Sequence, residues 1–390
     1  MANPIAVVVG LCAHGLAIAR SLSRAGVHVV AIEANRSLPG IKTCTAEVKF
    51  VDDINGAGLV SALISLAATI SATTVPILFL TNDTMVETVG RSHEKLSGLF
   101  RISWGSSRAD LLPLLRKKHV YQRCVDVGLL HPRSKLVSNG NDLTMHELDL
   151  RFPLIFKPDK PVSDYKTLVV GNTEQLKDSW KTIQNCLPAI AQEFIPGDDS
   201  KLLFAALYLD HGKVIARFEG RKLRSRPMGH TTVAIGETND KTHQMARQFF
   251  SGLEFSGPVS LEIKEDPTGD LWVIEPTVGR SDFWVGLCIN DGIDFPLIEY
   301  CQESCRKIEV PKQQNRTLWI NEERDPAVLT WLMFRYPRYL LHKRTVGVYM
   351  RAGDFRPFVK WAVNSVTLLP ERFLRKLMKT FRPNVGYRNR

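Results

Sequence analysis

The chain has 390 residues, of which 44% are hydrophobic, and a formal net charge of +11 at pH 7. This length suits two or three domains, and the apolar share is typical of globular proteins and excludes disordered or fibrous classes. The long apolar stretch 59–72 is too short to span a bilayer. The first residues lack the features of a secretory signal, so we expect a cytoplasmic protein.

The positive charge is concentrated near the C-terminus. Residues 303–390 hold 19 Lys and Arg against 7 Asp and Glu, a net +12, whereas the rest of the chain has a net charge of −1. Aromatic and basic residues alternate in this segment, which suits either peripheral contact with an anionic membrane or a helical cap with solvated arginines. A nucleic-acid recognition motif is lacking, so we expect no nucleic-acid partner.

Residues 5–33 have the pattern strand, glycine loop, helix, strand. Gly10 and Gly15 bracket the loop, Glu33 ends the second strand, and VPILFLTND at 75–83 is a third apolar strand. The pattern predicts a parallel α/β domain over residues 1–112. The glycine spacing is not that of a dinucleotide site or a P-loop, which favours a simple tight turn. A Rossmann-type NAD(P)-dependent oxidoreductase remains an alternative, because Glu33 has the position of a ribose-binding acid.

The pattern changes after residue 112. A helical stretch is followed from residue 151 by short strands typical of antiparallel sheets: PLIFKP, KTLVV, AIAQEFI, LLFAALYLD and KVIARFEGRKL. We assign residues 113–302 to a second domain of α+β type, and 303–390 to a basic aromatic C-terminal extension.

Basic residues in two of these strands are candidates for anion binding. Lys157 ends an apolar strand, where a buried ammonium is unfavourable unless it meets an anion such as phosphate. Lys222 and Arg224 have the spacing of one strand face, and such a pair can neutralise a phosphate or bind a carboxylate. Exposed strand residues are the alternative interpretation for all three.

Glu262 and Glu275 are the most informative acids. They lie in VSLEI and LWVIE, and the DPTGD between these strands has hairpin turn chemistry. A hairpin would bring both carboxylates to one side of a sheet, where a cation is needed between them. Mg²⁺ prefers a few carboxylate oxygens together with nucleotide phosphates. The alternative is an ordinary hairpin with exposed acids.

The order of these motifs, more than any one of them, resembles the ATP-grasp superfamily over about residues 1–300, in particular the carboxylate–amine ligases of the D-aspartate ligase type. The resemblance implies an N-terminal Rossmann-like domain followed by an ATP-grasp fold with antiparallel sheets. It also implies an ATP-dependent ligase that makes an amide or peptide bond through an acyl phosphate. The expected cofactors are ATP and Mg²⁺, or Mn²⁺ in its place, the expected partners a small-molecule carboxylate and amine, and the expected assembly a homodimer.

The resemblance assigns roles position by position. The nucleotide would be bound by Lys117 (with Lys118 as the fallback), Lys157, the hinge Glu193, Phe194 and Ile195, and the ribose-binding Asp199. Charge at the phosphate and substrate would be stabilised by Lys222, Arg224 and Arg280, and the metal would be held by Glu262, Glu275 and Thr277.

Two departures from the family pattern deserve note. Thr277 stands where the family has asparagine, and the loop after Lys157 lacks glycine and offers Ser163 and Lys166 to phosphate instead. A non-catalytic ATP-binding protein on the same scaffold is therefore a further alternative.

Overall fold

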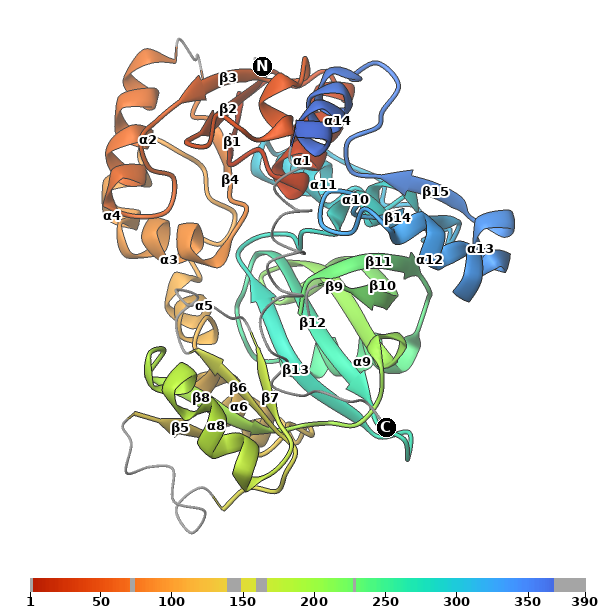
Figure 1. Cartoon of the computed structure of the whole chain (residues 1–390). Helices are drawn as coiled ribbons and strands as arrows, with labels where there is room; N and C mark the ends of the chain where they lie inside the picture. The colour runs from red at the N-terminus through yellow and green to blue at the C-terminus, as the bar shows by residue number, and fades with distance from the viewer. Residues whose placement is uncertain (1–2, 71–73, 139–148, 159–166, 227–228, 368–390) are drawn as a thin grey trace.

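The computed structural model describes residues 3–70, 74–138, 149–158, 167–226 and 229–367 (Figure 1). Within them the chain forms a parallel sheet at one end, a small antiparallel sheet at the other and a seven-stranded sheet between them. Ser163 and Lys166 lie outside the described residues.

The N-terminal domain is built on a parallel sheet of order β3-β2-β1-β4. Its elements are β1 (Ala6–Val9), α1 (Ala13–Arg24), β2 (Val29–Glu33), η1 (Pro39–Lys42), β3 (Glu47–Phe50), α2 (Ala57–Thr69), β4 (Ile77–Phe79), α3 (Asp83–Arg91) and α4 (His93–Leu96). Residues of β1 are fully buried and alternate between two cores, one beneath α2 and α3 and the other beneath α1. Helices on both faces therefore explain the continuous apolar run of this strand.

The turn after β1 is tight. A Cβ on Gly15 would lie 1.8 Å from the carbonyl oxygen of Gly10, so only glycine fits there. The carboxylate of Glu33 accepts hydrogen bonds from the backbone N–H of Leu11 at 2.6 Å and of Ala34 and Asn35 at 2.9 Å. Glu33 thus fixes the loop, and its oxygens are already engaged by the chain itself.

The small sheet has the order β5-β8-β6-β7 and a core of its own. The chain reaches it through α5 (Arg108–Leu114) and α6 (Lys117–Asp126). The sheet and the helix that accompanies it consist of β5 (Ser134–Val137), β6 (Leu154–Pro158), β7 (Leu168–Val170), α8 (Thr173–Gln184) and β8 (Ala189–Glu193).

The large sheet has the order β13-β12-β9-β10-β11-β14-β15. Its first part consists of η3 (Asp199–Lys201), β9 (Leu202–Asp210), β10 (Lys213–Ser225), β11 (Thr231–Gly236), α9 (Asp240–Phe249), β12 (Gly257–Glu265), β13 (Leu271–Val278), α10 (Val285–Asn290) and α11 (Phe295–Glu303). The predicted α/β domain, the antiparallel strands and the β12–β13 hairpin are confirmed.

The C-terminal extension is continuous with the body of the protein. It contributes β14 (Thr317–Ile320) and β15 (Arg344–Gly347) to the large sheet, and between them α12 (Val328–Arg335) and α13 (Pro337–His342). The last described helix, α14 (Arg356–Thr367), returns to the N-terminal domain and contacts η1. In the described part of the chain, we find no helix with the length and apolarity needed to cross a membrane.

Asp354 joins the extension to the N-terminal domain. Its buried carboxylate accepts hydrogen bonds from Arg20 Nε and Thr43 Oγ1, both at 2.7 Å, and from the Cys44 N–H at 2.9 Å. Burial alone would raise the pKa of Asp354, but the Cys44 N–H and the Arg20 guanidinium outweigh it and hold this pKa below its usual value.

We predict that Asp354→Asn lowers the free energy of unfolding by about 3 kcal/mol, because it leaves the buried Arg20 charge without its partner. Urea denaturation measures this. The matched control is Asp240→Asn, since Asp240 pairs with Arg217 at 2.9 Å but is 78% exposed. That change should cost under about 1 kcal/mol, and equal losses in the two variants would contradict the assignment.

Candidate active site

Glu262 and Glu275 face each other across the β12–β13 hairpin. They are directly paired in the antiparallel register, with a register irregularity just after Glu262. Side chains of such cross-strand pairs start about 4.5–5.5 Å apart, so two carboxylates there repel each other unless a positive charge intervenes.

Lys222 supplies a positive charge beside this pair. It lies on β10, on the far side of β9 from β12, and its Nζ forms an ion pair with Glu262 Oε2. The lysine side chain is only 6% exposed. Burial lowers the pKa of Lys222, but the carboxylates of Glu262 and Asp282 more than offset it, and the pKa is raised overall. The lysine is therefore held in its charged form against the acids.

Asp282 is a third acid of the site that the sequence analysis missed. Its Oδ2 accepts hydrogen bonds from Thr277 Oγ1 at 3.1 Å and from Ser260 Oγ at 3.2 Å. It also raises the pKa values of Lys222 and Arg280. It follows Glu275 by seven residues, beyond the end of β13, and no spacing rule identifies it from the sequence.

Glu262, Glu275 and Thr277 carry oxygen atoms of the kind that Mg²⁺ prefers as ligands. Thr277 donates its hydroxyl proton to Asp282, which leaves the oxygen lone pairs as acceptors. Within the described ranges, no group of three or more His, Cys, Asp or Glu side chains is arranged to hold a metal. The protein would thus provide Glu262, Glu275 and Thr277, with the other ligands coming from phosphate and water, which is the usual way Mg²⁺ is bound.

Arg280 connects this cluster to the N-terminal domain. Its side chain is 12% exposed, and its Nε donates to Asp83 Oδ1 at 2.7 Å, at the start of α3. Burial lowers the pKa of Arg280, but Asp83 and Asp282 outweigh this and raise it. Arg280 thus lies between the acids of the large sheet and the carboxyl end of the parallel sheet.

His14 makes a second connection between the two domains. Its Nδ1 lies 3.2 Å from the carbonyl oxygen of Thr81, and its Nε2 lies 2.9 Å from Ser281 Oγ. Because a carbonyl only accepts, Nδ1 carries the proton and Nε2 accepts from the serine hydroxyl. Burial, with a smaller contribution from Arg280, lowers the pKa of His14 to about 3.

The two nucleotide-binding lysines predicted from the sequence lie at the ends of β6 and α6. Lys157 Nζ donates to Gln192 Oε1 at 2.9 Å, and Lys117 Nζ donates to the carbonyl oxygen of Pro158 at 3.1 Å. Lys118, the fallback, is exposed. The structure thus brings Lys117 to the end of the strand that carries Lys157.

The predicted hinge begins at Glu193, the last residue of β8, and continues through Phe194 and Ile195. The Phe194 N–H bonds to the Pro153 carbonyl at 2.9 Å, whereas the N–H of Ile195 has no hydrogen-bond partner among the described residues. Lys264, which the sequence analysis missed, lies over the Phe194 ring at 4.5 Å. Burial lowers the pKa of Lys264, and the charge of Asp199 partly offsets this.

Asp199 and Arg224 each have a partner within the chain. Asp199 Oδ2 accepts from the Ser225 N–H at 2.6 Å. Arg224 forms an ion pair with Asp325 and lies 4.6 Å from the Trp331 ring. A register irregularity lies between Lys222 and Arg224, and in this structure the two side chains have different partners, Glu262 and Asp325. Their joint role at the phosphate stays a prediction.

No family model matches the chain. The D-aspartate ligase of Enterococcus faecium (strain Aus0004) is 26% identical over an alignment of 196 residues, and the match covers 45% of this chain and 47% of that protein. The match therefore spans about half the length of this curated relative.

Solved structures resemble the chain over most of its length. The N5-carboxyaminoimidazole synthetase of Staphylococcus aureus complexed with ADP has a TM-score of 0.63 at 14% identity, with 80% of this chain and 81% of that chain covered. The L-amino acid ligase of Bacillus licheniformis has a TM-score of 0.58 at 16% identity, with 78% and 75% covered. These likenesses confirm the expected ATP-grasp fold.

We predict that His14 lowers the free energy of unfolding as the pH falls below about 6.5. The unfolded chain takes up a proton near pH 6.5 and the folded protein only near pH 3, so unfolding is favoured by about 1.4 kcal/mol per pH unit between these values. His14→Gln should flatten the decline in unfolding free energy between pH 6 and pH 4 by about that slope. Urea denaturation at several pH values measures it, and parallel curves for the two proteins would contradict it.

Proposed function

Because the chain has the ATP-grasp fold, we propose that it is an ATP-dependent carboxylate–amine ligase. The observation that carries this proposal is the Glu262–Glu275 pair, opposed in register and balanced by the buried Lys222. A structural hairpin needs no such arrangement, because opposed acids and a buried lysine both destabilise a sheet. Binding a metal–phosphate group accounts for all three.

The nucleotide would lie between the small and the large sheet. Lys117 and Lys157 would hold its phosphates, and the Ile195 N–H, which has no partner in the described parts of the chain, would donate to adenine. The apolar ring of Phe194, with Lys264 on it, would flank the base. Asp199 would accept a ribose hydroxyl with the carboxylate oxygen that Ser225 leaves available.

The proposed reaction has two steps. The substrate carboxylate attacks the γ-phosphorus of ATP, the bond from this phosphorus to the bridging oxygen breaks, and ADP leaves with that oxygen. An amine then attacks the carbonyl carbon of the acyl phosphate, loses a proton and expels inorganic phosphate, which leaves an amide. Both steps depend on positioning and on neutralising charge.

The charged residues of the site suit this chemistry. Lys222, which is held protonated, and Arg280 would stabilise negative charge on the transferring group. A Mg²⁺ ion held by Glu262, Glu275 and Thr277 would supply Lewis-acid stabilisation of the phosphate oxygens. Arg280 also faces the N-terminal domain, where it would bind the substrate carboxylate beside His14 and Ser281.

The two alternatives differ in how they fit these residues. A NAD(P)-dependent oxidoreductase requires a ribose-binding acid at Glu33, whose oxygens are engaged by three backbone N–H groups. The alternative of a non-catalytic ATP-binding protein is based on Thr277, which stands in place of asparagine. Asp282, which orients the threonine hydroxyl, provides a compensation for that change.

We predict that Mg-ATP raises the melting temperature of the protein. At about 100 times its dissociation constant it adds roughly 2.7 kcal/mol to the folded state. Lys157→Ala should lose most of this shift.

Glu275→Ala tests the metal site. It should keep the shift in melting temperature with ATP and EDTA but lose the further increase that Mg²⁺ gives. It should also release no ADP in a screen of carboxylates and amines. A shift with NADH alone would contradict the proposal, and ADP release by Glu275→Ala would contradict the metal site.

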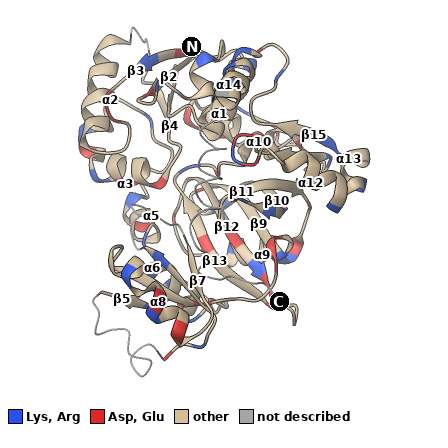
Figure 2. Cartoon of the chain, in the orientation of Figure 1, with Lys and Arg blue, Asp and Glu red and all other residues tan. Residues whose placement is uncertain are grey.

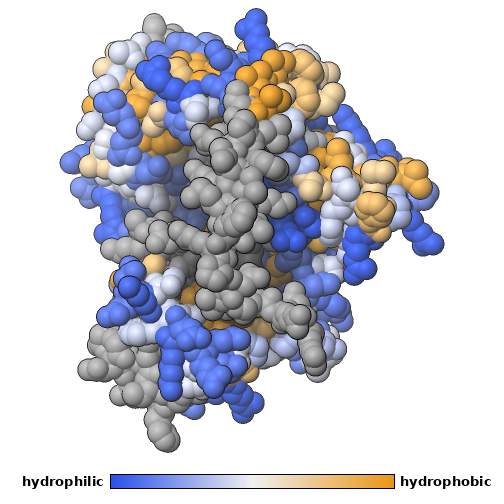
Figure 3. Space-filling view, in the orientation of Figure 1, coloured by the Kyte–Doolittle hydropathy of each residue, from blue (hydrophilic) through white to orange (hydrophobic). Residues whose placement is uncertain are grey.

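We further propose that the extension contacts an anionic membrane surface through α12 and α13. These helices project from one corner of the molecule (Figure 1). Large apolar side chains are exposed there: Leu329 at 51%, Met333 at 64%, Phe334 at 86% and Leu341 at 80%. Figure 2 shows basic residues on the same helices, and Figure 3 shows apolar surface beside hydrophilic surface at this corner.

The projecting corner thus combines apolar residues, which would enter the lipid, with cations, which would meet the lipid headgroups. The exposed cations Arg335, Arg338 and Arg344 each add about 1 kcal/mol near an anionic bilayer. Isolated exposed apolar residues need no explanation, but a group of four on two short helices does.

We predict that the protein floats with vesicles containing phosphatidylserine at low salt and not with neutral vesicles. Phe334→Ser combined with Leu341→Ser should weaken the binding at least about tenfold, because about 2 kcal/mol or more of apolar transfer is lost. Ile64→Ser, at a 40% exposed residue of α2, is the control and should bind like the wild type. Absence of flotation at low salt would contradict the proposal.

A further inference from the structure

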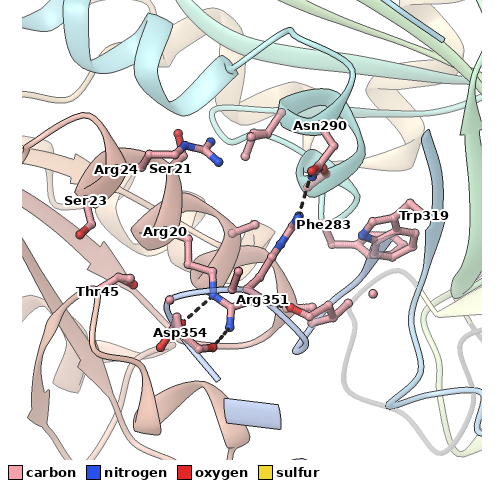
Figure 4. A pocket seen from close by; sticks show the side chains of 18 residues that line it. Arg20, Ser21, Ser23, Arg24, Thr45, Phe283, Asn290, Trp319, Arg351 and Asp354 are labelled. Carbon is pink, nitrogen blue, oxygen red and sulfur yellow. Dashed lines mark hydrogen bonds and ion pairs between the residues drawn. The ribbon is translucent and has the colours of Figure 1, made fainter. Parts of the chain in front are cut away.

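A cavity of about 270 Å³ lies where the extension meets the N-terminal domain (Figure 4). Its walls come mainly from α1, from Phe283 and α10, from Trp319 of β14, and from residues 347–354. None of the residues assigned above to the nucleotide, the metal or the phosphate lines it. Its volume approaches the lower end of the roughly 300–1,000 Å³ that is usual for small-molecule sites.

The cavity has a basic side and an apolar side. The basic side carries the guanidinium groups of Arg20, Arg24 and Arg351, and the apolar side carries Phe283 and Trp319, whose rings are 6.0 Å apart in an edge-to-face arrangement. A few polar groups placed opposite apolar and aromatic walls are typical of sites that bind and orient small molecules.

The three arginines differ in how many hydrogen bonds and ion pairs their guanidinium groups already form. Arg20 donates four hydrogen bonds, to the Asp354 carboxylate and to the carbonyl oxygens of Val348, Tyr349 and Asp354. Arg24 is 66% exposed and lies 3.6 Å from Asp294. Arg351 donates one hydrogen bond, from Nη1 to Asn290 Oδ1 at 3.0 Å, and forms no ion pair with a carboxylate in the described ranges of the chain.

Arg351 lies in an environment that opposes its charge. Burial lowers its pKa to about 10, the nearby charges of Arg20, Arg344 and Arg24 act in the same direction, and the carboxylate of Glu322 offsets them only in part. A half-buried guanidinium with one neutral partner has further donors to offer in a fixed planar fork. Carboxylate and phosphate oxygens match that fork and would relieve the repulsion.

We propose that this cavity binds a small organic anion, a carboxylate or a phosphate monoester, whose charged group pairs with Arg351 and whose apolar body lies against Phe283 and Trp319. Arg20 positions the 348–354 segment that carries Arg351, and Arg24 adds positive charge at the rim. The proposal does not depend on the ligase assignment, because it shares no residue with that site.

The test is calorimetric titration of the full chain with benzoate and phenyl phosphate, and with benzyl alcohol as the neutral isostere of the same ring. We expect at least one of the two anions to bind, which identifies the preferred acid group, and the alcohol not to bind. Arg351→Gln should weaken binding about tenfold or more, because a charged hydrogen-bond pair is lost. Arg338→Gln, on the distant α13, is the matched control and should bind as the wild type does.

Two further variants separate this cavity from the nucleotide site and from misfolding. Lys157→Ala should bind the anion unchanged, whereas binding lost in that variant would place the anion with the nucleotide and overturn the proposal. Arg24→Gln, at an exposed residue, keeps the fold and should weaken binding less than Arg351→Gln does. Failure of both anions to bind, or equal affinity in Arg351→Gln and the wild type, also overturns it.

Discussion

The opposition of Glu262 and Glu275 across one hairpin is the constraint on which the site depends. Two acids at paired positions repel each other, and Lys222 reaches Glu262 from β10 across the width of β9. The sheet order β12-β9-β10 therefore has an electrostatic consequence, because it is what places the lysine beside the acids. Burial then strengthens each of these interactions, since little water remains to screen them.

The same acids also determine how the N-terminal domain is attached. Arg280 pairs with Asp83 while Asp282 and Glu275 raise its pKa, and His14 bonds to Ser281 next to it. Two neighbouring residues after β13 thus hold the carboxyl end of the parallel sheet against the large sheet. The parallel sheet contributes no assigned phosphate ligand, but it forms one wall of the place where a substrate would meet the phosphate.

Local patterns in the sequence predicted the strands, the glycine turn, the hairpin and the paired acids, because each depends on residues close together in the chain. They did not predict Asp282, Lys264 or the partner of Arg224. Asp282 also accepts from Ser260 on β12, Lys264 contacts Phe194 just beyond β8, and Arg224 pairs with the distant Asp325. Such partners depend on sheet order, and a single sequence does not encode sheet order in any short spacing.

The net positive charge of the C-terminal extension does not correspond to a single basic surface. Among the residues that the structure describes, cations of the extension occur in separate places: Arg351 lines a cavity against α1 and α10, whereas Arg335 and Arg338 are exposed beside Phe334 and Leu341. The separation follows from β14 and β15, which join the large sheet and leave α12 and α13 projecting between them. The segment after β15 then turns back to α1, where Asp354 and Arg20 hold it. Because both places are set by the same two strands, the proposed anion binding in the cavity and the proposed contact at the projecting helices would act on one continuous element.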